Sequence, residues 1–206
     1  MRLGIFGGTF DPPHVGHLLA ASDAFEALAL DRLVFVPAAT QPLKAGRETA
    51  PAGQRLEMLA LLVAGDPRFE VDPIEIARTG LSYTVDTLES FASRYAAAER
   101  FFLVGADIID SFDRWREPER VLELAQLVIL QRAADGSMAR PAAEVEEWGA
   151  GWGRRGGGVR APRVLPTRRV DVSSTEVRSR VRDGKSVHGF VPDAVAEYIA
   201  RGGLYR

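Results

Sequence analysis

Two histidines, His14 and His17, lie three positions apart, shortly after an apolar stretch from Leu3 to Phe6. Paired glycines at a strand end bring bare backbone N–H groups close to a ligand, and a helix that starts after Asp-Pro-Pro points more N–H groups and its positive dipole end the same way. Residues three apart share one helix face, and Gly16 would leave room for a ligand between the rings. We therefore predict a phosphate site formed by Gly7, Gly8, Thr9, Phe10, His14 and His17.

Three alternative roles fit this segment less well. A tight turn with two solvated histidines would account for either histidine alone. The Gly-x-Gly-x-x-Gly pattern occurs only at Gly151 to Gly156, in a linker-like stretch after no strand, and the Gly-x-x-x-x-Gly-Lys-Ser/Thr phosphate loop is absent. Zinc-binding helices usually space histidines four apart around a glutamate, and the chain has no cysteine, so we expect no metal held by protein ligands alone.

A second junction between a strand and a helix is expected at Val172 to Arg178. Ser173 or Ser174 is a natural N-cap. Arg178 follows within the first turn or so, where the helix dipole already favours an anion, so an arginine there suits a phosphate better than it suits the helix. Alone the segment is a capped helix start; together with the histidines it predicts a second phosphate contact through Ser173, Ser174, Thr175 and Arg178.

Two further segments offer contacts for the rest of a nucleotide. Gly105-Ala106-Asp107 ends an apolar strand, and Asp107 either caps the next helix or accepts two ribose hydroxyls. Trp115 follows eight residues later and supplies a flat face for a heteroaromatic ring. Ser82-Tyr83-Thr84 is typical of a helix start, with Ser82 or Thr84 as its cap, and a helix start can hold an anion.

These segments resemble one family. Residues 7–17 read Gly-Gly-Thr-Phe-Asp-Pro-x-His-x-Gly-His, which resembles the bacterial nicotinate mononucleotide adenylyltransferases of the His-x-Gly-His nucleotidyltransferase superfamily. Residues 172–178 are similar to that family's Ile-Ser-Ser-Thr-x-Ile-Arg, residues 82–88 to its Ser-Tyr-Thr-x-Asp-Thr-Leu, and Asp107 with Trp115 to its Gly-x-Asp and tryptophan. Lys44 lies where the family has Pro-Pro-His-Lys, although Gln41 and Leu43 depart from that pattern. The resemblance is interrupted mainly at 133–163.

The resemblance implies adenylyl transfer from ATP to nicotinate mononucleotide, giving nicotinate adenine dinucleotide and pyrophosphate in NAD biosynthesis. His14, His17 and Arg178 would be catalytic, with His17 at the α-phosphate and Arg178 at the β- and γ-phosphates. The ATP site would add Gly7, Gly8, Thr9, Phe10, Gly105, Asp107, Ser173, Ser174 and Thr175. The acceptor site would comprise Lys44, Tyr83, Thr84 and Trp115, with the Thr84 amide on the nicotinate carboxylate. Mg²⁺ would be bound mainly through ATP phosphates, and Arg55 and Arg132 would have supporting roles.

Other functions stay open at this point. The acceptor could be nicotinamide mononucleotide, phosphopantetheine or, in a cytidylyl transfer, a phospho-alcohol; the Ser-Tyr-Thr segment and Trp115 favour nicotinate. A nucleotide-sensing module that binds without turnover is the alternative outside enzymes. The presence of His14, His17 and Arg178 favours an enzyme.

Composition narrows the partners. The chain has 206 residues, 46% hydrophobic, which is enough for one sizeable core. With 26 Lys and Arg against 28 Asp and Glu, its net charge of −2 gives no reason to expect nucleic acid or an anionic membrane as a partner. The lack of cysteine, and of any signal-peptide pattern, leads us to expect the cytoplasm. The sequence leaves a homo-oligomer open.

Strands and helices should alternate through most of the chain. Strands are expected at Leu3–Phe6, Leu33–Pro37, Phe69–Asp72, Phe101–Val104, Leu127–Leu130 and Arg168–Val172, and helices at Val15–Leu30, Ala52–Ala64, Thr84–Tyr95, Pro118–Ala125 and Pro192–Arg201. Apolar strands without polar alternation predict an α/β fold with a doubly wound, mainly parallel, Rossmann-like sheet and a small C-terminal helical part. Ligands of such sheets lie beyond the carboxyl ends of the strands, where the two strand-end glycine segments fall.

We expect a single domain over 1–206 with a variable excursion at 133–163. That segment is rich in Gly, Ala and Arg. A short helix from about Pro141 to Trp148 would dock it on the body through Trp148 and Trp152, for which packing is favoured over a ligand role.

Overall fold

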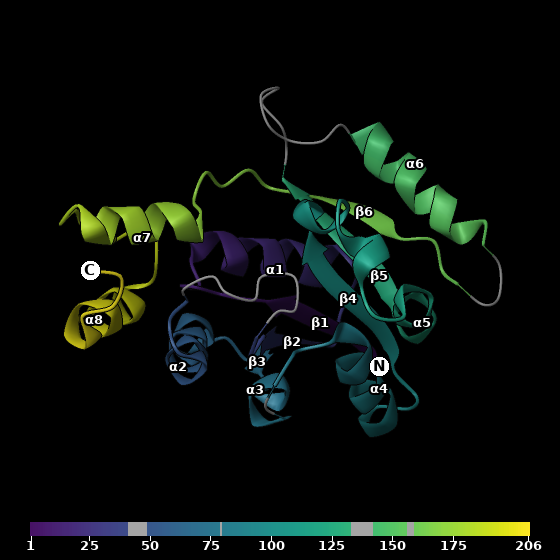
Figure 1. Ribbon diagram of the computed structural model, residues 1–206, viewed down its shortest axis with the longest axis horizontal. Helices are drawn as coiled ribbons and strands as arrows, with labels where there is room; N and C mark the ends of the chain where they lie inside the picture. The colour runs from purple at the N-terminus through teal and green to yellow at the C-terminus, as the bar shows by residue number, and fades with distance from the viewer. Residues whose placement is uncertain (41–48, 79, 133–141, 156–158) are drawn as a thin grey trace.

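The computed structural model describes residues 1–40, 49–78, 80–132, 142–155 and 159–206. Its centre is a six-stranded sheet in the order β3-β2-β1-β4-β5-β6, in which every neighbouring pair is parallel (Figure 1). The strands are β1 (Arg2–Gly8), β2 (Arg32–Pro37), β3 (Phe69–Val71), β4 (Glu99–Gly105), β5 (Gln126–Arg132) and β6 (Arg163–Thr167). The doubly wound parallel sheet that the sequence predicts is confirmed.

Helices cover both faces of this sheet. They are α1 (Val15–Ala27), α2 (Ala52–Val63), α3 (Ile74–Arg78), α4 (Thr84–Arg94), α5 (Pro118–Leu124), α6 (Ala142–Gly153), α7 (Ser174–Arg182) and α8 (Asp193–Gly202), with the short 3-10 turns η2 (Ala106–Ile108) and η3 (Phe112–Arg114) after β4. Alternate strand residues point to opposite faces: Phe6 lies in one core with side chains of α1, α2, α7 and α8, and Ile5 in another with those of α4, α5 and α6.

The sheet ends in a strand that the sequence patterns misplace. The strand expected at Arg168–Val172 is wrong, because β6 occupies Arg163–Thr167 and pairs with β5. Pro166 makes this run look unsuited to a strand, but a proline is tolerated in an edge strand, where one side of the backbone has no partner strand. The chain then leaves the sheet, and the backbone N–H and guanidinium of Arg168 both bind the Asp23 carboxylate of α1.

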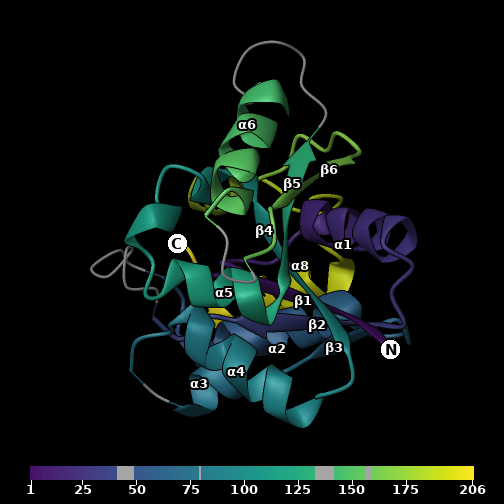
Figure 2. The same cartoon turned by 90° about the vertical axis from the view of Figure 1, so that its right-hand side faces the viewer.

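Helices α1 and α6 differ most from their expected extent, and α3 is a helix that the sequence patterns did not predict. Helix α1 ends at Ala27 rather than Leu30, because Ala29 has a positive φ of 45° and the Leu30 N–H binds the Phe25 carbonyl. Helix α3 has five residues, too few to show a helical period in the sequence. Helix α6 runs on to Gly153, and Figure 2 shows it beside β5 and β6. Within the described residues no helix is both long enough and apolar enough to cross a bilayer.

Candidate active site

The site lies where the chain reverses its progress across the sheet. From β1 the chain moves outward through β2 and β3, and then returns to place β4 on the other side of β1. Because β1 and β4 pair directly, with Phe6 opposite Leu103, their carboxyl ends lie side by side. The histidine segment after β1 and Asp107 after β4 therefore start from the same edge of the sheet, as expected for a doubly wound fold.

The paired glycines at the end of β1 make room for aromatic rings. A Cβ atom on Gly7 would lie 3.0 Å from the ring of Phe102, and one on Gly8 would lie 2.9 Å from the ring of Phe10. Phe10 itself is buried and has a positive φ of 51°. Glycine at 7 and 8 thus has a packing role at the strand end in addition to exposing backbone N–H groups.

His14 and His17 form a stacked pair at the start of α1. Their ring centroids are 3.7 Å apart with 29° between the planes, and His14 is buried. The His17 Nδ1 accepts a hydrogen bond from the His14 backbone N–H at 3.2 Å. An accepting Nδ1 carries no proton, so neutral His17 must carry its proton on Nε2. The second nitrogen of this ring is therefore a hydrogen-bond donor.

Gly16 has a different role from the one predicted. We expected it to leave room for a ligand between the two histidines, but a Cβ atom there would lie 3.0 Å from two atoms of the His14 ring. The histidine rings stack on each other, and the space over Gly16 is filled by His14. Gly16 therefore permits the histidine pair to form, and any phosphate must approach the pair from outside.

Helix α7 places its start directly against the loop before α1. The Ser174 hydroxyl donates to the Pro12 carbonyl at 2.8 Å, and the Arg178 Nη1 donates to the Asp11 carbonyl at 2.6 Å. Ser173 is the N-cap of α7, since its Oγ accepts from the Glu176 N–H at 3.1 Å. Of the two serines that the sequence offered as caps, one thus caps the helix and the other joins the two loops, which are about 160 residues apart in the chain.

Asp11 connects this loop to two more parts of the chain. It is buried, and its Oδ1 accepts from the Ala50 N–H at 3.1 Å and from the Tyr205 hydroxyl at 2.7 Å. Its Oδ2 lies 3.7 Å from Arg178 Nη1. Burial, followed by the hydrogen bond to Asp11, raises the pKa of Tyr205, so the hydroxyl stays protonated and keeps donating.

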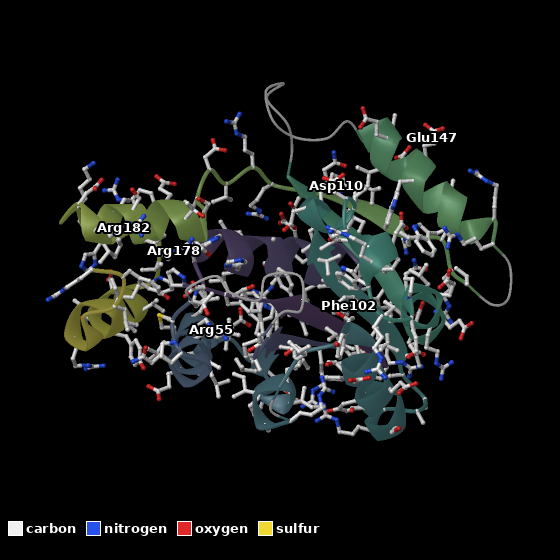
Figure 3. The ribbon with its side chains drawn as sticks, in the orientation of Figure 1. Arg55, Phe102, Asp110, Glu147, Arg178 and Arg182 are labelled. Atoms are coloured by element: carbon white, nitrogen blue, oxygen red, sulfur yellow. The ribbon has the colours of Figure 1, made fainter. Side chains whose placement is uncertain are left out.

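Arg55 forms hydrogen bonds with the backbone just after β1 and just after β2. Its guanidinium is buried and donates to the carbonyls of Ala50, Thr9 and Ala39 at 3.0, 2.7 and 3.0 Å. Burial lowers the pKa of Arg55, and the negative charge of the nearby Asp11 carboxylate acts in the opposite direction. Figure 3 shows Arg55 on α2 and Arg178 on α7, the two arginines that approach this loop.

An aromatic surface lies beyond the end of β4. Trp115 is half-buried, with its ring centroid 5.1 Å from that of Phe112 and 6.4 Å from that of Phe102 on β4. Phe102 is labelled in Figure 3. The neighbouring Arg116 guanidinium lies 5.0 Å from the centre of the Tyr83 ring, which brings the end of η3 next to the start of α4. Asp107 is exposed on η2, directly after the carboxyl end of β4.

The start of α4 has no side-chain cap, contrary to expectation. Tyr83 is its N-cap residue and Thr84 its first helical residue. The Ser82 hydroxyl, predicted as a cap, instead accepts from the Ala39 N–H at 2.9 Å and so ties α4 to the loop after β2. The first N–H groups of a helix have no partner within the helix, so those of α4 are suited to an anion.

A buried carboxyl group lies under the start of α4. Glu75 of α3 accepts from the Thr87 hydroxyl at 2.7 Å, and Thr87 in turn accepts from Arg78 at 3.0 Å. Desolvation raises the pKa of Glu75, while Thr87, Ser82 and Arg78 lower it and Asp86 raises it further. The carboxyl therefore takes up its proton more readily than an exposed glutamate.

Comparison with known proteins places the chain in a family. A model described as cytidylyltransferase-like matches residues 5–180. A protein of Gemmatimonas aurantiaca is 51% identical over 206 residues, covering 100% of this chain and 93% of its own, and one of Thermus thermophilus is 46% identical over 209, covering 100% of both. Both carry the name "Probable nicotinate-nucleotide adenylyltransferase". The chain belongs to the nicotinate-nucleotide adenylyltransferases. The resemblance carried by its motifs is confirmed.

Solved structures show that the fold is that of distant adenylyltransferases. A nicotinic acid mononucleotide adenylyltransferase of Plasmodium falciparum, solved in complex with NaAD, matches with a TM-score of 0.75 at 15% identity, covering 99% of this chain and 97% of its own. At that identity the likeness shows the fold alone. The fold of this nicotinate-nucleotide adenylyltransferase is thus similar to that of a protein with which it shares little sequence.

Most of the predicted site residues of this adenylyltransferase fall into two groups, while Gly7 and Gly8 end β1 and Gly105 and Asp107 lie at the end of β4. The structure brings the histidine segment and the start of α7 together, and we call Thr9–His17 with Ser173–Arg178 the phosphate side. It also brings the end of η3 next to the start of α4, and we call Tyr83, Thr84 and Trp115 the ring side. Lys44 lies outside the described residues. Sequence patterns did not mark Tyr205 or Glu75 as parts of the site, because their contacts with Asp11 and Thr87 form only in the folded chain.

Proposed function

We propose that this chain transfers the adenylyl group of ATP to nicotinate mononucleotide. An oxygen of the acceptor's 5′-phosphate forms a bond to the α-phosphorus of ATP, and the bond from that phosphorus to the bridging oxygen breaks, so that pyrophosphate leaves with the electron pair. The products are nicotinate adenine dinucleotide and pyrophosphate. Because the substrate supplies the nucleophile, the protein has only to align two anionic groups and stabilise the charge that develops on the phosphoryl oxygens.

The observation that carries this proposal is the meeting of two helix starts on the phosphate side. Helix α1 follows the loop that contains Asp11 and Pro12, and the start of α7 packs against the same loop. The positive dipole ends of both helices therefore lie near it. His17 offers an N–H donor at Nε2, and Arg178 offers a fixed cationic fork. We assign His14 and His17 to the triphosphate, with His17 at the α-phosphate, and Arg178 with Ser173–Thr175 to the β- and γ-phosphates.

Preorganisation supports these assignments. The tautomer of His17 is set by the His14 N–H, and the Arg178 side chain is held by the Asp11 carbonyl and by Thr175 Oγ1 at 3.3 Å. Donors that are already aimed cost no reorganisation when charge develops in the transition state. Gly7, Gly8, Thr9 and Phe10 complete the loop, and Gly105 and Asp107 at the end of β4 would meet the nucleoside.

The ring side suits a small acidic heteroaromatic group. Trp115 presents a half-buried indole for stacking, and the uncapped start of α4 offers the Thr84 N–H with a helix dipole behind it. A carboxylate on the ring would be stabilised there. A neutral amide would present its NH₂ to a donor, and both groups would stay poorly paired. These contacts favour nicotinate mononucleotide over its nicotinamide counterpart, with Lys44 as a further acceptor contact.

A divalent cation fits this site as a companion of the triphosphate. Within the described residues, no three His, Asp or Glu side chains lie close enough together to hold a metal ion. The buried carboxylate on the phosphate side, that of Asp11, already accepts from the Ala50 N–H and the Tyr205 hydroxyl. The N–H and guanidinium donors beside it bind phosphate and do not bind a cation. We therefore assign Mg²⁺ to the phosphate oxygens and to water, where it would offset the charge of the triphosphate.

Pyrophosphate release on mixing ATP with nicotinate mononucleotide tests the function directly. We expect release with the wild-type chain and a large loss with His17→Ala. The third histidine provides a matched control, since His188 is exposed, pairs with Asp193 and lies in neither side of the site; His188→Ala should release pyrophosphate at the wild-type rate. Binding of both substrates without release would support the nucleotide-sensing alternative instead, and release only with another acceptor would correct the substrate.

A further inference from the structure

A continuous cluster of aromatic side chains joins α6 to the ring side. Phe112 lies at its centre, fully buried, with its ring centroid 5.1 Å from that of Trp115. On its other side lie two tryptophans of α6: Trp152 at 5.0 Å and Trp148 at 5.5 Å, with interplanar angles of 85° and 80°. Edge-to-face arrangements are among those that aromatic pairs prefer, so each ring influences the orientation of the next. The predicted packing role of the two tryptophans is confirmed.

Helix α6 is docked closely enough to aim these rings. A Cβ atom on Gly149 would lie 3.0 Å from the Pro162 carbonyl oxygen, and one on Gly153 would lie 2.8 Å from the Ala161 side chain. These glycines, four apart, let the helix approach the backbone that leads into β6. The tryptophans at 148 and 152 have the same spacing and so share a neighbouring face of the helix.

Trp152 is also held from its outer side. The Arg155 guanidinium lies 3.7 Å from the centre of the Trp152 ring, and it pairs with Glu119 of α5 at 2.7 Å. Trp152 is only 3% exposed, so it has little freedom to turn. The indole thus contacts both Arg155 and Phe112, and Phe112 contacts both Trp152 and Trp115.

We propose that Trp152 is a positioning residue for the acceptor ring, acting through Phe112 on the orientation of Trp115. The inference rests on the proposed function, in which Trp115 stacks on that ring. Helix α6 then sets the affinity for the acceptor without touching it. Because this helix belongs to the segment where the family resemblance is interrupted, affinity for the acceptor is adjustable there without altering the shared motifs.

Steady-state kinetics of Trp152→Leu test the inference. Loss of one edge-to-face contact should raise KM for nicotinate mononucleotide by roughly threefold to tenfold, and leave kcat and KM for ATP near their wild-type values. Trp152→Phe keeps an aromatic edge and should restore most of the affinity. Glu146→Ala, on the exposed side of the same helix, is the matched control and should change nothing.

A double-mutant cycle separates positioning from general damage. Trp115→Ala alone should raise the same KM, and adding Trp152→Leu to it should raise that KM no further, because no stacking ring remains to be oriented. An equal rise in both backgrounds, or a matching rise in KM for ATP, would overturn the inference.

If Trp152→Leu does not fold, Trp148→Leu serves in its place. Trp148 is only half-buried, so the expected rise in KM for nicotinate mononucleotide is smaller. An unchanged KM in Trp148→Leu would also overturn the inference. An unchanged KM in Trp115→Ala would instead refute the ring side of the proposed function.

Discussion

The phosphate side and the ring side are held in place by different kinds of contact. On the phosphate side, directed hydrogen bonds join distant segments: Ser174 to Pro12, Arg178 to Asp11, and Tyr205 to Asp11. On the ring side, one edge-on and one tilted ring hold Trp115, and the helix start at Thr84 has no side-chain cap. A hydrogen bond is lost with a small displacement, whereas an aromatic contact tolerates several angles.

The difference matches what we propose that each side binds. A reacting phosphate needs donors fixed at the positions where charge develops, so errors there should appear in the rate of the chemical step. A heteroaromatic ring needs a flat face and one partner for its substituent, so errors there should appear in affinity and in the choice of acceptor. Variants on the two sides should therefore separate kcat from KM.

The largest effect is expected at His17. His17→Ala removes the Nε2 donor, and we expect kcat to fall by about 10²–10³, the usual cost of one preorganised transition-state donor. Alanine is the better helix former, so α1 should survive. Pyrophosphate release gives the rate and circular dichroism the fold. Near-normal turnover would remove His17 from the chemistry, and an unfolded variant would make its role structural.

The choice of acceptor tests the ring side. Wild-type kcat/KM should favour nicotinate over nicotinamide mononucleotide by roughly two orders of magnitude, since two poorly paired polar groups each cost about 1–3 kcal/mol. Thr84→Pro removes the N–H while keeping α4, because proline is tolerated at the first position of a helix. The preference should then largely disappear. Thr84→Ala keeps the N–H and should keep the preference; a preference unchanged in both variants would refute this role of Thr84.

Arg178 should affect ATP more than the acceptor. Arg178→Ala removes a charge-assisted contact to the triphosphate, worth about 1.5–3 kcal/mol, so KM for ATP should rise by roughly 10- to 100-fold. Arg182→Ala, at the end of the same helix, is the control for the loss of an α7 charge. A selective rise in KM for nicotinate mononucleotide would mean that Arg178 contacts the acceptor rather than ATP.

The smallest effect is expected in the free energy of unfolding, from Glu75 beneath the start of α4 on the ring side. A raised pKa means that folded Glu75 binds a proton more readily than the unfolded chain does, so its contribution to stability is present at low pH and is lost as pH rises above about 4.5, its ordinary value. Glu75→Gln keeps an acceptor for Thr87 and has no proton to lose. The free energy of unfolding of the wild type, measured with urea relative to that of Glu75→Gln, should fall with rising pH. A difference that grows with pH would mean that Arg78 outweighs burial.

Local patterns predicted the segments of the site but not the contacts between them. The motif residues, the strands that carry them and the parallel sheet follow from short runs of sequence. The Ser174 hydrogen bond to Pro12 depends on how α7 packs, and so does the fate of Ser82, whose hydroxyl binds Ala39 rather than capping α4. The prediction that Gly16 leaves room for a ligand is wrong for the same reason, because nothing in the sequence places the His14 ring next to Gly16.

The hydrogen bond from Tyr205 to Asp11 closes a loop of 194 residues. Contacts between such distant residues form late, because the intervening chain must first be ordered. During synthesis, the Asp11 carboxylate in the loop after β1 is made 194 residues before its hydroxyl partner, Tyr205. The growing chain can build β1 and pair it with β4 long before this point, so its fold and its capacity to bind a nucleotide should be acquired at different times.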